Sequence, residues 1–90
     1  MIIVSQDKGK IINFDNMTRV YIVFYEGDDD VCIRTETVDS LYEDLGYYKT
    51  EARAKEVLKQ IIETYENCNA CAISIGCGYV KNKVYEMPIN

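Results

Sequence analysis

A chain of 90 residues is long enough for one domain and too short for two, because an independent core usually needs about 50 residues or more. Apolar residues make up 48% and charged residues 28%, a balance that excludes intrinsic disorder, so we expect residues 1–90 to form a single globular domain. The net charge of −5 argues against direct binding of nucleic acid, since affinity for phosphates comes from lysine and arginine.

Two short β-rich runs open the chain, at residues 2–5 and 10–14. The connection between them includes Asp7 and Gly9, residue types that favour tight turns, glycine because it adopts positive φ without a Cβ clash. These runs predict a β-hairpin.

Residues 18–26 form the strongest predicted strand, and both of its faces are apolar or aromatic. One face carries Val20, Ile22 and Phe24, and the other carries Tyr21, Val23 and Tyr25. Residues 27–30 predict a turn, and the alternation over 31–38 predicts a half-buried return strand. Further on, the pattern predicts only a short strand at 45–48.

The helix prediction starts at Thr50, a good N-cap, with Glu51 in the first turn where the helix dipole favours a negative charge. An apolar stripe at helical spacing follows, consisting of Ala54, Val57, Leu58, Ile61, Ile62 and Tyr65. Asn67 is the predicted end of the helix, and residues 70–75 and 79–87 are predicted as two more strands.

Together these elements predict an α+β fold: a curved antiparallel β-sheet of about five to seven strands, with one amphipathic helix packed across it. In that arrangement Leu58, Ile61 and Ile62 are expected to be buried against Ile22 and Phe24.

Three segments resemble a group of short, largely uncharacterised proteins from Firmicutes, their phages and plasmids. They are the opening Ile3-Val4-Ser5-Gln6-Asp7, the stretch from Gly46-Tyr47-Tyr48 through the helix to Leu58, and the closing Val84-Tyr85-Glu86-Met87-Pro88. The resemblance implies a mobile-element protein. By analogy with other small acidic proteins of that kind, it implies an inhibitor of a host defence system such as an anti-CRISPR.

Four cysteines, Cys32, Cys68, Cys71 and Cys77, leave two interpretations open. They could bind zinc in a zinc-stabilised module, because Cys68 and Cys71 have the CxxC spacing of half a site. The sequence has no second CxxC pair and no histidine, so we expect reduced thiols, with Cys32 and Cys71 as small buried hydrophobes on strands, and no metal or cofactor.

No sequence motif indicates catalysis. The chain has no histidine, no GxSxG and no glycine-rich phosphate loop, so we do not expect an enzyme. No apolar run approaches the about 20 residues of a membrane span, and the N-terminus lacks the features of a secretory signal. We therefore expect a cytoplasmic protein with no membrane partner.

The distribution of acidic residues and the number of tyrosines indicate that the chain binds another protein. Residues 26–44 contain eight acidic residues against one basic residue, and the chain has eight tyrosines, more than a small core can bury. Tyrosine favours interfaces because it offers a large, stiff contact area with one polar tip. The predicted partner-binding residues are Tyr21, Tyr25, Asp28, Asp29, Asp30 and Glu36. The predicted partner is a protein with a basic surface. The alternative is a small structural or housekeeping domain that forms a homodimer through its apolar strand faces.

Overall fold

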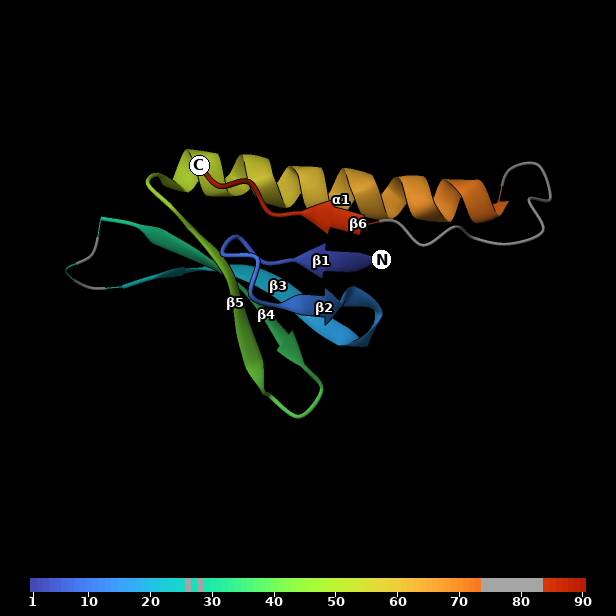
Figure 1. Ribbon diagram of the computed structural model, residues 1–90, viewed down its shortest axis with the longest axis horizontal. Helices are drawn as coiled ribbons and strands as arrows, with labels where there is room; N and C mark the ends of the chain where they lie inside the picture. Colours follow the sequence, from blue (N-terminus) through green and yellow to red (C-terminus); the bar gives the residue numbers. More distant parts are fainter. Residues whose placement is uncertain (26, 28, 74–83) are drawn as a thin grey trace.

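The computed structural model describes residues 1–25, 27, 29–73 and 84–90, with backbone alone for 67–73 (Figure 1). These residues form one α-helix and two β-sheets of three strands each. The α+β class is therefore confirmed, and the prediction of one antiparallel sheet of five to seven strands is wrong. The strands divide because β1 and β2 pair with the C-terminal strand and not with the central hairpin.

The large sheet consists of β3 (Met17–Phe24), β4 (Val31–Thr37) and β5 (Tyr42–Tyr48), all antiparallel and in that order. The first two strands lie where the alternation predicts them, while β5 begins three residues earlier than predicted. The β4–β5 register shifts between Ile33 and Arg34, which pair with Gly46 and Asp44. Leu45 is therefore an extra residue in a bulge, and its side chain is buried in the core.

The small sheet has the order β2–β1–β6, from β1 (Ile2–Val4), β2 (Ile11–Asn13) and β6 (Val84–Glu86). The predicted hairpin of β1 and β2 is confirmed, although Lys8 and not Gly9 takes the positive φ of the turn. Strand β6 runs parallel to β1, a pairing that an antiparallel sheet does not provide. A single 3₁₀ turn, Phe14–Asn16, leads from β2 into β3.

Helix α1 spans Glu51–Ile73, and Thr50 caps it as predicted, its side-chain oxygen accepting a hydrogen bond from the Arg53 amide at 3.1 Å. The prediction that the helix ends at Asn67 is wrong, because the helix continues to Ile73. The strand predicted to begin at residue 70 is therefore wrong for residues 70–73. Asparagine disfavours a helix interior only mildly, and Ala70 and Ala72 are strong helix formers. The part of the last predicted strand before residue 84 lies outside the described residues.

The core forms where α1 lies along one side of both sheets (Figure 1). Its buried side chains are Met1, Ile3, Ile12, Val31, Ile33, Leu45, Tyr48, Ala54, Val57, Ile61 and Met87. The predicted burial of Ile61 is confirmed, and Leu58 and Ile22 pack against the core half-buried. The predicted burial of Phe24 and Ile62 is wrong, since they are 59% and 54% exposed. The large sheet contributes buried side chains to the core from β4 and β5. Side chains of edge strand β3 and of the adjacent side of the helix therefore remain partly exposed.

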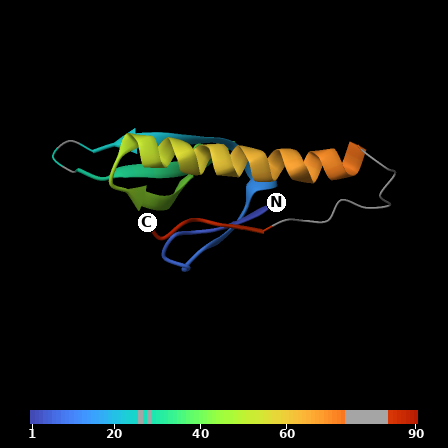
Figure 2. The same ribbon diagram turned by 90° about the horizontal axis from the view of Figure 1, so that it is seen from above.

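Gln6 joins the two sheets at the free edge of β5. Its backbone amide donates to the Leu45 carbonyl, and its side-chain amide exchanges two hydrogen bonds with the Tyr47 backbone, all at 2.8 Å. A Cβ on Gly46 would lie 2.9 Å from the Gln6 Cβ, so this close approach requires glycine. Figure 2 shows the small sheet beyond β5, on the side away from β3.

Candidate binding face on the large sheet

The large sheet has one face toward the helix and one face away from it, and residue alternation assigns each side chain to one of them. Val31, Ile33 and Thr35 of β4 are buried on the inner face. Arg34 and Glu36 lie on the outer face, where the strand pairing sets them beside tyrosines of β3 and β5. We call this outer surface the tyrosine–arginine face; it consists of Arg19, Tyr21, Tyr25, Arg34, Glu36, Tyr42, Asp44 and Tyr47.

Arg34 lies at the centre of this face with only 14% of its side chain exposed. Its Nε donates to Asp44 Oδ1 at 2.7 Å, and its Nη2 donates to the Tyr25 hydroxyl. The guanidinium carbon also lies 4.0 Å from the centroid of the Tyr42 ring, within cation–π range. The hydrogen bond to Asp44 raises the pKa of Arg34, so the centre of the face keeps a fixed positive charge.

Asp44 is the acidic partner of this arginine and stays ionised. Burial acts to raise the pKa of its carboxyl, but hydrogen bonds from Arg34 and Tyr47 outweigh burial and hold the pKa below its ordinary value. The Tyr47 hydroxyl donates to Asp44 Oδ2 at 3.0 Å, and this bond raises the pKa of Tyr47 to about 12. Both groups therefore keep fixed charge states near neutral pH.

A second arginine pair lies further along the sheet. Arg19 Nε donates to Glu36 Oε2 at 2.7 Å, and its guanidinium lies 4.6 Å from the Tyr21 ring centroid. Each carboxylate of the face thus has its own arginine. The tyrosine–arginine face is therefore charge-balanced.

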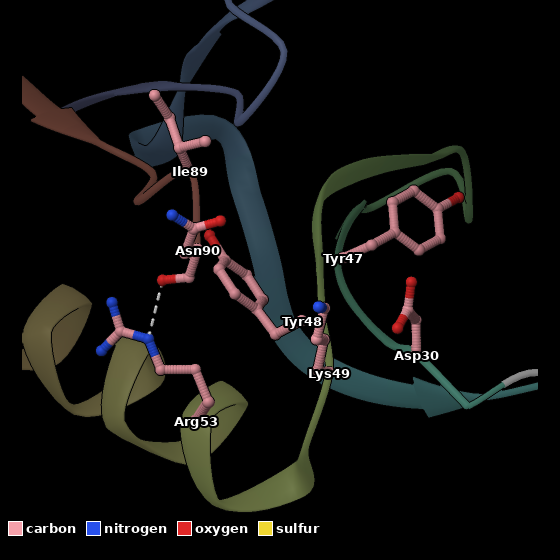
Figure 3. Close-up of a pocket in the computed structure, with 7 residues that line it drawn as sticks. All are labelled: Asp30, Tyr47, Tyr48, Lys49, Arg53, Ile89 and Asn90. Carbon is pink, nitrogen blue, oxygen red and sulfur yellow. Dashed lines mark hydrogen bonds between the residues drawn. The ribbon is translucent and has the colours of Figure 1, made fainter.

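Further acidic residues lie at the β3–β4 turn. Gly27 takes a φ of +89°, and Asp29 and Asp30 are exposed; Asp28 and Glu26 lie outside the described residues. Asp30 and Tyr47 line one open pocket of about 460 Å³ with Tyr48, Lys49, Arg53, Ile89 and Asn90 (Figure 3). The acidic turn therefore borders the tyrosine–arginine face.

Two polar side chains of this pocket bind the C-terminal segment. Arg53 donates through Nε to the Asn90 carbonyl at 2.9 Å and through Nη1 to Glu56 at 3.0 Å. Tyr48 donates its hydroxyl to the Pro88 carbonyl at 2.7 Å, and burial raises its pKa to about 12. These two side chains thus hold the C-terminal segment, Arg53 from the helix and Tyr48 from β5.

The cysteines do not come together as a four-thiolate site would require. Cys32 is fully buried in β4 and pairs with Tyr47, close to the start of the helix; burial raises its pKa to about 11. Cys68 and Cys71 lie on α1, about 25 Å or more along the helix from its first residue. Cys32 is therefore too distant for a metal site shared with them, while Cys77 lies outside the described residues. Within the described ranges no group of three metal-binding side chains is found.

The structure brings three predicted site residues together, Tyr21, Tyr25 and Glu36, and leaves Asp29 and Asp30 at the border. Sequence reasoning missed the other members of the face: Arg19, Arg34, Tyr42, Asp44 and Tyr47. The signal that could have identified two of them is the single arginine in each of β3 and β4, with Arg19 in phase with Tyr21 and Tyr25.

Comparison with known proteins finds no match: no family model, no curated protein and no solved structure is similar to this chain. The face is therefore assigned from its own contacts. In the described part of the chain, no helix combines the length and apolarity needed to cross a membrane.

Proposed function

We propose that this domain binds a protein through the tyrosine–arginine face and acts by binding, not by catalysis. The observation that carries the proposal is a set of tyrosines fixed around two paired arginines on a sheet face that no described element covers. Tyrosine and arginine dominate the binding energy of many protein interfaces. Side chains already held in place lose less conformational freedom when a partner binds.

The tyrosine side chains of the face are exposed to the degree that an interface requires. Tyr42 and Tyr47 are 56% and 46% exposed, while Tyr21 and Tyr25 are half-buried beside arginine side chains. The exposed rings offer contact area, and the charged groups beneath them already have partners. A binding protein would therefore cover the rings without leaving a buried charge unpaired.

The partner we propose carries a basic surface. The face is charge-balanced, but it borders exposed Asp29 and Asp30, and the chain as a whole carries −5. Acidic groups at the rim of an interface accelerate association with a basic partner and add less to affinity itself.

The resemblance to phage and plasmid proteins extends the proposal. A small acidic protein with one binding face fits an inhibitor of a host defence protein, of which an anti-CRISPR is one kind. On this proposal the domain acts in the cytoplasm, where such a partner would be found.

A capture experiment with matched variants tests the proposal. The wild-type chain, a Tyr21→Ala/Tyr42→Ala variant and a Lys55→Ala/Lys59→Ala control, altered on the exposed side of the helix, would each be used as bait. We expect a protein retained by the wild type and the control and lost with the tyrosine variant. Equal capture by all three baits would refute the assignment of this face.

A further inference from the structure

Strand β3 presents an open edge. Within the described residues β3 pairs with β4 along one side, and no strand pairs with its other side. The opposite edge of the large sheet, at β5, is occupied by Gln6. An eight-residue edge that no described strand pairs with is a template for another strand.

Exposed apolar side chains lie near both ends of β3: Phe24 is its last residue, and the contact between Phe14 and Tyr65 comes just before its first. Phe24, Ile62 and Tyr65 are 59%, 54% and 41% exposed. On the helix, Gln60 accepts a hydrogen bond from Tyr85 of β6, so Ile62, two positions further along, lies on the side of the helix away from the small sheet. Tyr65 contacts Phe14, just before β3, with ring centroids 6.0 Å apart. We call Phe24, Ile62 and Tyr65 the β3 flank.

We infer that the occupant of this edge is β3 of a second copy of the chain, paired antiparallel about a two-fold axis. The regular part of the strand, beyond the irregularity between Met17 and Arg19, has Tyr21 near its centre. Symmetry about Tyr21 sets Arg19 opposite Val23 and Val20 opposite Ile22. The pairing joins two three-stranded sheets into one of six strands.

Charge favours a second copy at this edge. Arg19 is the one charged residue of β3, and Glu36 of the same chain already balances it. In the register about Tyr21 the two copies place no like charges opposite each other. Elsewhere a chain of net charge −5 repels its own copy, so the charge-balanced edge and its flank form the surface on which two copies can approach.

The dimer would have a consequence for the proposed function. Two tyrosine–arginine faces would lie side by side on one continuous sheet, doubling the surface offered to a partner. The inference does not depend on that function, because a monomer could bind a partner through the same face.

Sedimentation over a wide range of concentration tests the dimer. We expect the wild type to have the mass of two chains and to dissociate on dilution. A Phe24→Lys/Ile62→Lys variant should dimerise at least about tenfold more weakly, because two charges would be placed at the flank. The control is Val38→Lys/Leu41→Lys, at positions that are 80% and 68% exposed in the β4–β5 turn region; it should dimerise as the wild type does. A wild type with the mass of one chain at every concentration would overturn the inference, as would equal weakening in the control.

A cross-link tests the register. Residues opposite each other in an antiparallel pair lie close enough for a disulfide bond. In a chain with Cys68, Cys71 and Cys77 changed to serine, Tyr21→Cys should form a covalent dimer on mild oxidation. Tyr42→Cys in the same chain should not. Covalent dimers in equal yield from both variants would contradict pairing about Tyr21.

Discussion

The two faces of strand β4 differ in how their side chains are held. On the inner face Val31, Ile33 and Thr35 are nearly or fully buried under the helix and its neighbours. On the outer face Arg34 and Glu36 are fixed by ion pairs with Asp44 and Arg19. One face stabilises the fold by excluding water, and the other presents an ordered polar and aromatic surface. Neighbouring residues of one strand should therefore respond differently to substitution, in stability on one side and in binding on the other.

Truncation on the inner side of the structure should give the largest loss of stability. Ile61 is 1% exposed in the core, so Ile61→Ala should lower the free energy of unfolding by about 2–4 kcal/mol. Ile62→Ala, one residue along on the exposed flank, should cost less than about 1 kcal/mol in the monomer. Chemical denaturation of both variants, at concentrations where the chain is monomeric, measures the contrast. Equal losses would remove the distinction between buried and open sides of the helix.

Removing the central arginine of the outer face should have an intermediate effect. Arg34→Ala removes the hydrogen bonds that Arg34 donates to Asp44 Oδ1 and to the Tyr25 hydroxyl, a loss of about 1–3 kcal/mol. Asp44→Asn tests the same pair from the other side and should cost a similar amount. The double variant should cost clearly less than the sum of the two losses, because both remove one interaction. Additive losses would show that the pair does not act as a unit.

The Arg34–Asp44 pair should also make stability depend on pH. The folded pKa of Asp44 lies below its ordinary value, so its contribution is present above about pH 4 and is lost as pH falls through the folded pKa. As the pH is lowered from neutral to acidic, the melting temperature of the wild type should therefore fall more steeply than that of Asp44→Asn. Asp30→Asn, which removes one exposed carboxylate, is the matched control and should keep the wild-type slope.

The acidic turn should have the smallest effect on stability. Changing Asp28, Asp29 and Asp30 together to asparagine touches no core residue, so the free energy of unfolding should change by less than about 0.5 kcal/mol. Association with a basic partner should become slower at low salt, and the difference should shrink as salt is raised. Stopped-flow or surface-based kinetics at two salt concentrations checks both statements. An unchanged association rate would reduce this segment to a solvated turn.

Local pattern was enough to predict the helix start, the N-terminal hairpin and the strands that became β3 and β4. It also placed Tyr21 and Tyr25 on one side of a strand, because alternation is a local property. The division into two sheets was not predictable in this way, since β1 finds its parallel partner β6 more than 80 residues along the chain. The end of the helix was not predictable from local pattern either, because the helix continues past Asn67, which disfavours helix only mildly, into a segment that contains Ala70 and Ala72.

The charge balance of the binding face depends on long-range register. Arg34 and Asp44 are ten residues apart and meet only because the bulge at Leu45 shifts the pairing of β4 with β5. Arg19 and Glu36 are 17 residues apart and meet across β3 and β4. From the sequence alone both carboxylates count toward an acidic segment, and only the strand pairing shows that arginines balance them.

Site-specific photo-cross-linking tests the central assignment, the tyrosine–arginine face as the binding surface, most directly. A benzophenone amino acid would replace Tyr42, which is 56% exposed on this face, or Val84, which is 60% exposed on the small sheet. Irradiation in host cells should then give an adduct with another protein from position 42 and not from position 84. An adduct from Val84 alone, or equal adducts from both positions, would contradict the assignment.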